Sequence, residues 1–267
     1  MIDALRDKKQ VARSFGRAAA TYDSVADFQR KVGRSLFDML PLSPAETVLD
    51  LGCGTGFFYS QLQQKFSGAR VVGLDLAEGM LQYCAANQKG DWLCADAENL
   101  PLADNSIDLV YSSLAIQWCE NNDALFAELF RVLRPGGQVF FSTLGPDTLH
   151  ELRRAWSTVD NYVHVNRFTE KVDLLAAIQQ AGFNKQQLLL TEQQVILEYE
   201  TLRELTWELK GIGAHNVNSG RLVGLTGRKR MQTFIKGYEQ QRNAKGLLPA
   251  SYQVWLGRLI KPVDLSS

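Results

Sequence analysis

The segment TVLDLGCGTGFFYSQL, residues 47–62, places the strongest constraint on the fold. An apolar run typical of a strand ends at Leu51, glycines stand at positions 52, 54 and 56, and a helical pattern follows. Glycine allows left-handed backbone angles and lets a ligand lie against bare backbone. A helix that begins after such a loop directs free N–H groups and the positive end of its dipole at the ligand. The segment therefore predicts a strand, a loop and a helix that together hold a nucleotide-like ligand.

Strand-like and helix-like segments alternate along the middle of the chain. A helical region over residues 7–40, with a break near Thr21–Ser24, comes first. Strands are then expected within residues 47–52, 70–76, 92–101, 106–118 and 138–145, with helices between most of them. Such alternation predicts a mainly parallel sheet with helices on both faces, an α/β Rossmann-like class. Two further β segments within residues 185–200 are expected to pair as an antiparallel edge hairpin, which makes seven strands.

Two stretches do not fit this alternation, and we expect them to form a lid. Residues 145–168 and residues 200–255 would follow the carboxyl edge of the sheet, where insertions commonly cover a ligand crevice. The expected organisation is a helical cap over 1–45, a core over 46–200 with an insertion at 145–168, and a basic lid segment with the C-terminal edge over 201–267. Between the two stretches, a helix is expected to start at Thr169 as its N-cap and to end before Gly182.

Charge is distributed unevenly although the formal net charge is zero. Residues 1–34 contain eight Lys/Arg and four Asp/Glu, residues 35–204 contain 11 and 22, and residues 205–267 contain ten and three. If the two ends fold together, they make a basic face for an acidic partner. No apolar run reaches the length of a membrane span, and no signal peptide is recognised, so we expect a cytoplasmic protein. Four scattered cysteines and three separated histidines indicate neither disulfides nor a metal site.

The spacing of glycines and acidic residues limits which class of nucleotide-like ligand the loop can bind. A P-loop motif is absent, and the third glycine comes one residue earlier than in a dinucleotide fingerprint. Asp50 precedes the loop and would repel a pyrophosphate but favour a cationic group. Asp75 closes the next predicted strand and suits ribose hydroxyls, whereas Asp96 follows the third strand and suits an exocyclic amine. A ribose, an amino-bearing base and a cationic tail together describe S-adenosylmethionine.

The ordered motifs VLDLGCGTG, GLDLAEGML, ADAENLP, IDLVYSSLAIQW and LRPGGQVFFST resemble those of class I S-adenosylmethionine-dependent methyltransferases. The resemblance covers residues 46–145. It implies that Gly52, Gly54 and Gly56 lie along the methionyl part, that Asp75 binds the ribose, and that Asp96 with Ala97 binds the adenine. Leu76 and Met80 would pack near the base. S-adenosyl-L-homocysteine would be the product.

A further set of segments covers nearly the whole chain, including the expected lid. VARSFGRAAATYDSVADFQRKVGRSL, SSLAIQWCEN, LHELRRAWSTVDNYVHVNRF and LKGIGAHNVNSGR are similar to the malonyl-acyl-carrier-protein O-methyltransferases of biotin synthesis. This resemblance implies methylation of the free carboxylate of a malonyl thioester carried by acyl-carrier protein or coenzyme A. A carboxylate is already ionised at neutral pH, so no general base is needed.

Candidate residues for the reaction follow from this expectation. Arginine is a two-pronged donor for a carboxylate, and Arg167, Arg221 and Lys210 are the candidates to hold it. Arg153, Arg154, Arg228, Lys229 and Arg230 would steer an acidic carrier. The residues expected to close over the sulfonium and methyl are Tyr22, Gln29, Gln117 and Trp118, with Gln29 also assigned to the cofactor.

Other functions are also considered for this sequence. Another small carboxylate or a quinone precursor could be the methyl acceptor. A nucleic-acid methyltransferase would favour a basic surface, but its usual motif is missing where SSLAIQW stands. A regulator that binds the cofactor or the carrier without catalysis is a further class, and a dehydrogenase is disfavoured by the glycine spacing and Asp50. No nucleic-acid or membrane partner is expected.

Overall fold

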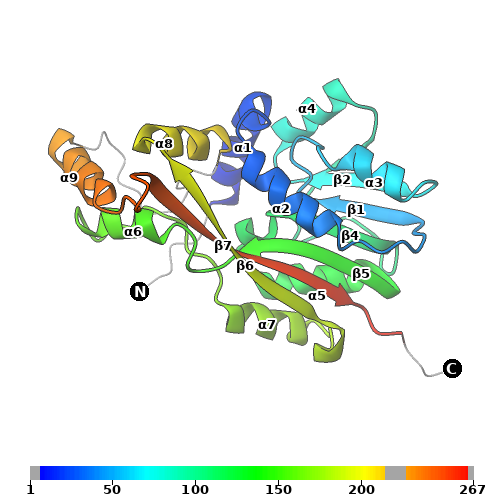
Figure 1. Cartoon of the computed structure of the whole chain (residues 1–267). Coiled ribbons are helices and arrows are strands. Elements are labelled where there is room, and N and C mark those ends of the chain that lie inside the picture. Colours follow the sequence, from blue (N-terminus) through cyan, green and yellow to red (C-terminus); the bar gives the residue numbers. More distant parts are fainter. Residues whose placement is uncertain (1–6, 214–226, 264–267) are drawn as a thin grey trace.

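A single mixed sheet organises the chain, with helices on both faces (Figure 1). The computed structural model describes residues 7–213 and 227–263. Within these ranges seven strands are hydrogen-bonded in the order β3-β2-β1-β4-β5-β7-β6. The first five of that order run parallel, and β7 is antiparallel to both of its neighbours. The strands are β1 (Thr47–Leu51), β2 (Arg70–Asp75), β3 (Asp91–Cys94), β4 (Ile107–Ser113), β5 (Leu133–Leu144), β6 (Leu189–Tyr199) and β7 (Leu248–Ile260).

The helices divide between the sheet and the insertions. Those that alternate with the strands are α3 (Tyr59–Lys65), α4 (Glu78–Asn87), α5 (Asn122–Val132) and α7 (Lys171–Gln180), with the short 3-10 turns η1 (Ile116–Trp118) and η2 (Lys185–Gln187). Two N-terminal helices precede them, α1 (Lys8–Tyr22) and α2 (Asp27–Phe37). The expected lid stretches contain α6 (His150–Ser157), α8 (Leu202–Gly211) and α9 (Arg228–Glu239).

Side chains alternate between the two faces of the sheet, as strand geometry requires. Val48 and Tyr111 belong to one core, which is covered by α2, α3 and the insertion helices. Leu49 and Val110, their neighbours in the chain, belong to the second core under α5 and α7. Because β1 is covered on both faces, Val48–Leu51 is almost fully buried and reads as a continuous apolar run interrupted only by Asp50.

An antiparallel pair at the sheet edge is present as expected, but its placement as a hairpin within residues 185–200 is wrong. That segment holds one long strand, β6, whose partner is β7, and the two are joined through α8 and α9 (Figure 1). The strand count was correct, but residues 248–260, placed in the lid by the helical reading, enter the sheet between β5 and β6. The pattern misled because two apolar runs, residues 189–190 and 195–197, are separated by the polar residues 191–194, although one continuous strand runs through all of them.

Two expected helix and strand boundaries differ in detail. Glu170, not Thr169, is the N-cap residue of α7, and Thr169 Oγ1 instead accepts a hydrogen bond from Asn122. Gly182 follows α7 with φ +107°, as expected for a left-handed helix end. The RPGG segment, residues 134–137, does not only end α5. It is an irregularity inside β5, where the register with β4 jumps from Leu133 to Gln138.

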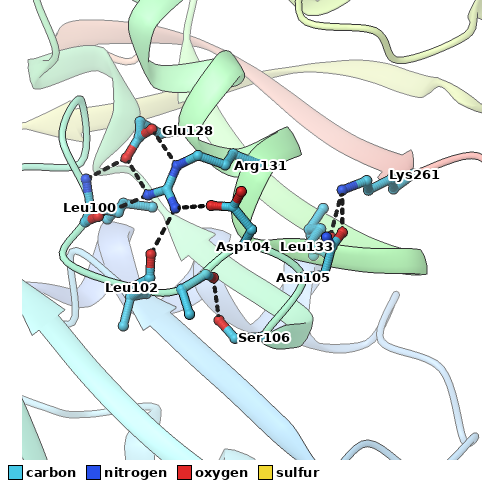
Figure 2. Close-up of polar contacts among 10 residues, drawn as sticks. Leu100, Leu102, Asp104, Asn105, Ser106, Glu128, Arg131, Leu133 and Lys261 are labelled. Atoms are coloured by element: carbon cyan, nitrogen blue, oxygen red, sulfur yellow. Dashed lines mark hydrogen bonds and ion pairs between the residues drawn. The ribbon is translucent and has the colours of Figure 1, made fainter.

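An arginine clamp fixes the segment between β3 and β4 (Figure 2). Arg131 on α5 donates to both carboxylate oxygens of Glu128, to Asp104 and to the carbonyl oxygens of Leu100 and Leu102, at 2.7–2.9 Å. The N–H of Leu100 in turn donates to Glu128 at 2.6 Å. A planar guanidinium can satisfy several acceptors at once, so this clamp holds the turn that carries Asp96 and Ala97.

The two N-terminal helices cover different parts of the sheet: α1 ends beside the glycine loop at the carboxyl edge, and α2 packs on one face. Thr55 in the glycine loop donates to Asp23 at the end of α1, and Tyr111 on β4 donates to the carbonyl of Gly33 in α2 at 2.8 Å. Ser14 on α1 donates to the carbonyl of Gly213 after α8 at 2.9 Å, which brings the cap and the lid together. In the described ranges, no helix has the length and apolar character needed to cross a membrane.

Candidate active site

Two cavities open at the carboxyl edge of the sheet. The first, called the loop cavity here, has a volume of about 110 Å³ and is lined by the glycine loop, the ends of β2 and β3 and one side of α1. The second, called the lid cavity, has a volume of about 1030 Å³ and lies among α2, α6, α8, α9 and the segment after α6. The parallel sheet thus places a small and a large space side by side where a switch in strand order leaves a crevice.

The glycines of the loop have different functions. Gly52 and Gly54 line the loop cavity, and both have positive φ. A Cβ on Gly54 would meet nothing within 4 Å, so its open side is room for a ligand. A Cβ on Gly56 would lie 2.2 Å from the side chain of Gln88. Because that atom is the end of a flexible side chain, the φ of +75° is the stronger reason for glycine at position 56, and Gly56 is absent from the described lining of the loop cavity.

Asp75 lines the loop cavity at the end of β2 and also organises the loop. One carboxylate oxygen accepts from the N–H of Gly54 at 2.9 Å and the other from the N–H of Ala77 at 2.8 Å. Burial raises the pKa of Asp75, although these hydrogen bonds oppose the shift. Each oxygen keeps further acceptor capacity, so the side chain can tie down the loop and still bind hydroxyl groups.

Asp96 lines the same cavity beside two other charges, Lys8 and Glu98. Lys8 on α1 lies 2.6 Å from Asp96 Oδ2 and 2.8 Å from Glu98 Oε2. The other oxygen of Asp96 accepts from the N–H of Glu98 at 3.0 Å. Burial alone would lower the pKa of Lys8, but its hydrogen bonds to the two carboxylates raise it. No motif or spacing around Lys8 predicts that it reaches this cavity.

Asp50 is 3% exposed, and the structure does not place it in the described lining of the loop cavity. Its Oδ2 atom is buried with no hydrogen-bond partner among the described residues. Burial, with the charge of Asp75 as a second cause, raises the pKa of Asp50 to about 8. Asp50 is thus an unmet acceptor beneath the loop, which a nearby cation would stabilise in its charged form.

Four side chains line both cavities and form a partition between them: Phe15 and Tyr22 on α1, Leu114 after β4, and Trp118 in η1. Phe15 and Trp118 pack edge to face with ring centroids 5.0 Å apart. Leu114 has φ +50°, a strained conformation for a leucine that recurs at functional sites. Burial and the negative charges of Asp75 and Asp23 raise the pKa of Tyr22, so its hydroxyl stays protonated at neutral pH.

The two cavities have opposite charge. The loop cavity is lined by Asp75, Asp96 and Glu98 with Lys8 as the one Lys or Arg among its described residues. The described lining of the lid cavity contains Arg203, Lys210 and Arg230 and no Asp or Glu. Arg203 and Lys210 stand seven residues apart on one face of α8. Neither has an ion pair in the described part of the chain, whereas Arg230 pairs with Asp160.

Asp160 joins the lid helices into one wall. It accepts from the N–H of Tyr162 at 2.9 Å, lies 2.7 Å from His164 Nε2 and pairs with Arg230 on α9. Burial acts to raise the pKa of Asp160, but these hydrogen bonds lower it overall. Trp156 stacks on His164 at 3.8 Å and on Phe234 at 4.2 Å between centroids. The lid cavity is therefore aromatic along one side and cationic along another.

The residues expected at the site separate into groups. Leu76, Met80, Asp96 and Ala97 line the loop cavity, and Tyr22 and Trp118 stand in the partition. Gln117 and Gln29 line the lid cavity, and Gln29 is absent from the described lining of the loop cavity, where a cofactor-binding residue was expected. Gln117 donates to the carbonyl of Leu114 at 2.6 Å and supports the partition.

The Lys and Arg residues expected to bind the substrate depart most from their expected positions. Lys210 lines the lid cavity, but Arg167 is exposed and outside its described lining. Arg153 donates to the carbonyls of Pro146 and Thr148 and is used to hold that turn. Arg154 is exposed on α6, Arg228 and Lys229 are exposed at the start of α9, and Arg221 lies outside the described residues.

Sequence reasoning missed Lys8, Phe15, Leu114, Asn166 and Arg203. Leu114 follows the carboxyl end of a predicted strand, which is the one signal that could have identified it. Phe15 and Asn166 lie within segments that carry the resemblance, and Lys8 and Arg203 lie outside them, but no local pattern distinguishes any of the four as a cavity residue.

Comparison with known proteins now bears on this geometry. Residues 49–141 match the model of a methyltransferase domain. The chain is 54% identical over 96% of its length to a biotin biosynthesis bifunctional protein, BioHC, of Cellvibrio japonicus, and covers 51% of that protein. It is 42% identical over 96% of its length to the malonyl-[acyl-carrier protein] O-methyltransferase of Gallionella capsiferriformans, and covers 91% of that protein.

The chain belongs to the malonyl-[acyl-carrier protein] O-methyltransferase family. It spans about half the length of its bifunctional relatives and nearly all of this family's shorter members. Among solved structures, phosphoethanolamine N-methyltransferase 2 of Haemonchus contortus, in complex with S-adenosylhomocysteine, aligns with a TM-score of 0.56 at 19% identity. That alignment covers 92% of this chain and 57% of the other. It shows the class I methyltransferase fold, in agreement with the malonyl-[acyl-carrier protein] O-methyltransferase assignment.

Proposed function

We propose that the protein transfers a methyl group from S-adenosyl-L-methionine to the free carboxylate of a malonyl thioester on acyl-carrier protein. The observation that carries this proposal is the pair of cavities with opposite charge that share one wall. An acidic cavity suits a cationic methyl donor, and a cationic cavity suits an anionic acceptor. Family membership supplies the names of donor and acceptor, and the ester would serve an early step of biotin synthesis.

The residues present fit this cofactor. Gly52 and Gly54 leave the loop backbone open, Asp75 would hold the ribose, and Asp96 with Ala97 would hold the adenine beside Leu76 and Met80. Asp50 offers an unmet buried acceptor in the same region for the cationic part. When bound, the cofactor supplies a methyl group on a positively charged sulfur.

The chain contributes position and exclusion of water to the chemistry. The new bond joins a carboxylate oxygen to the methyl carbon as the sulfur–methyl bond breaks, and no proton moves. The partition side chains would surround this line of transfer, and aromatic faces such as those of Phe15 and Trp118 stabilise a cation. Tyr22, kept protonated, is a hydrogen-bond donor there. Good orientation alone can be equivalent to effective molarities of about 10⁵–10⁸ M.

Lys210 is our first candidate to hold the malonyl carboxylate. Lys210 lines the lid cavity near the end of α8. Gly213, which follows α8, accepts a hydrogen bond from Ser14 on α1, the helix that carries two of the partition side chains. Tyr22, Gln117 and Trp118 would shape the reacting end. Arg167 stays a candidate for substrate binding, although the lid would have to rearrange to bring it to the cavity.

The carrier would approach over the lid helices. Arg154, Arg228 and Lys229 are exposed there, and Arg230 lines the cavity while it pairs with Asp160. An acidic carrier would be steered by such a surface in a salt-dependent way. Arg153 is a weaker candidate for steering because backbone carbonyls already occupy its guanidinium.

A transfer assay with labelled S-adenosylmethionine tests the proposal. Malonyl-acyl-carrier protein, malonyl-coenzyme A, free malonate and aconitate are offered side by side. Base-labile label on the malonyl carrier would support a carboxylate methyl ester. Label on aconitate or malonate alone would indicate that another small carboxylate is the methyl acceptor. Label on none of the four, with the cofactor still bound, would contradict the proposed malonyl substrate.

A further inference from the structure

Two amide side chains in the lid cavity have no hydrogen bond in the described part of the chain. Gln29 comes from α2 and Asn166 from the segment between α6 and α7, and both line the cavity. The atoms Gln29 Oε1 and Asn166 Oδ1 are buried without a partner, and Asn166 is only 7% exposed. A buried polar group without a partner destabilises the folded protein, and native structures contain few such groups.

The chemistry of these atoms limits the ligand. Each unmet atom is a carbonyl oxygen, which accepts hydrogen bonds, so the ligand must offer a donor. Turning either amide round would leave an N–H unmet instead. A ligand group that offers both an N–H and a carbonyl satisfies either arrangement. A carboxylate and a thioester offer acceptors only, so the malonyl group itself does not meet the requirement.

The surroundings favour a neutral group at this place. Phe28, Val165, Phe168 and Tyr252 line the same cavity, and all four belong to or pack on the core that includes α2. In such low-polarity surroundings a hydrogen bond between neutral amides is strong, whereas an unpaired charge is costly. A secondary amide is neutral and has both a donor and an acceptor.

We propose that Gln29 and Asn166 bind a secondary amide of the substrate's pantetheine arm. The inference rests on the proposed function, because carrier proteins hold their acyl group on an arm of this kind, which contains secondary amides. The two side chains would then act as specificity residues. They would distinguish a thioester on a pantetheine arm from one on a simple alkyl thiol.

Two substrates matched in length test this assignment. The malonyl thioester of N-acetylcysteamine contains the amide nearest the sulfur, and that of pentane-1-thiol replaces the amide with methylenes. Wild-type enzyme should prefer the first by about tenfold or more in kcat/KM, the equivalent of one good hydrogen bond. Asn166→Leu and, separately, Gln29→Leu should lower kcat/KM for the amide substrate and leave the alkyl substrate nearly unchanged. The malonyl thioester of pantetheine shows whether the second amide of the arm is the one bound.

Gln187→Leu is the matched control. Gln187 Oε1 is also buried without a partner, but Gln187 lies outside the described lining of both cavities. That variant should keep the full preference for the amide substrates. If Asn166→Leu and Gln29→Leu both keep the wild-type preference for the amide-containing thioesters, the proposal is wrong.

A binding measurement separates this inference from the proposed function. Pantetheine, which has no acyl group, is titrated into the cofactor-loaded protein and followed by NMR. Binding that weakens about tenfold in Asn166→Leu supports the amide assignment even if no malonyl thioester is methylated. Equal binding to wild type and variant, or none to the wild type, overturns it.

Thermal unfolding distinguishes recognition from a structural role. Replacing an unmet buried amide by leucine removes a desolvation cost, so the melting temperature of the free protein should stay the same or rise. A clear fall in melting temperature together with lost preference in both variants would assign the two amides to the fold and contradict the proposal.

Discussion

The loop cavity and the lid cavity share a wall but are built in different ways. The loop cavity is formed mainly by strand ends and the short segments after them, and its charges are mostly acidic. The lid cavity is formed by helices inserted into the fold, and its described charges are all cationic. The difference teaches that one sheet edge can present opposite potentials to a cation and an anion only a side chain apart. Methyl transfer between such groups neutralises both charges, which a dry site favours.

The largest effect on this comparison is expected from Asp75→Ala. The substitution removes an acceptor for the ribose and also releases the N–H groups of Gly54 and Ala77. Hydrogen bonds to a charged group are worth about 1.5–3 kcal/mol each, so the dissociation constant of S-adenosylmethionine should rise by at least about tenfold. Isothermal titration measures it, with the exposed Asp147→Ala as control. An unchanged constant would remove Asp75 from the cofactor site.

Lys210→Gln tests the cationic side of the comparison. Loss of one charged hydrogen bond should raise KM for the malonyl carrier by about tenfold and leave cofactor affinity unchanged. Lys210→Glu should have a larger effect because it repels the carboxylate. Steady-state kinetics measures both, with Lys185→Gln, exposed in η2, as control. If cofactor affinity falls and KM does not change, the two cavities have been assigned the wrong ligands.

Asp50 gives the cofactor-free protein a distinctive pH dependence. Its pKa in the folded state, about 8, is above the ordinary value for an aspartate, 3.8. The folded state therefore binds the proton more tightly, and the free energy of unfolding should fall as pH rises from about 4 to about 8 and then level off. Asp50→Asn should remove most of this slope and raise the melting temperature at pH 8 by several degrees.

Calorimetry between pH 5 and pH 9 compares the two proteins without cofactor. The slope is the decisive quantity, because the asparagine introduces its own unmet groups and shifts the whole curve. An equal slope in wild type and variant would show that Asp50 is ionised in the free protein.

The smallest effect concerns the surface around the lid. The value of kcat/KM for malonyl-acyl-carrier protein should fall several-fold between ~50 and ~300 mM salt, because screening weakens steering by exposed charges. The value of kcat/KM for malonyl-pantetheine, which lacks the carrier protein, should change little with salt. Arg228→Gln with Lys229→Gln should flatten the dependence, and Lys185→Gln should not. Identical salt curves for both substrates would exclude steering by the carrier's acidic surface.

The two cavities also differ in how far they could be foreseen. The glycine loop and Asp75 follow from local pattern, since strand ends of a parallel sheet meet at one edge whatever the rest of the chain does. Lys8 and Arg203 are brought to their cavities by packing between distant segments, and no periodicity of their own predicts that. Gln29 was expected at the cofactor, whereas its position on α2 places it in the lining of the lid cavity.

The error over β7 has the same origin. The two apolar runs within residues 185–200 predict two short strands, because a hairpin pairs the segments that are nearest in sequence. The actual partner of β6 follows after α8 and α9, and pairing across such a separation is decided by tertiary fit. Local pattern correctly predicted the element types around the cofactor and failed where the chain leaves the sheet and returns.

The interior position of β7 has a consequence for how the protein is made. Residues 248–260 come after the other described elements, yet they separate β5 from β6. Until they leave the ribosome, β5 has a free edge that includes Phe140 and Phe141, both buried in the finished sheet. An unpaired apolar edge is a template for association with another chain. The nascent chain is therefore expected to be most prone to aggregation after β5 has been synthesised and before β7 emerges, when the strands that carry the loop cavity are already present.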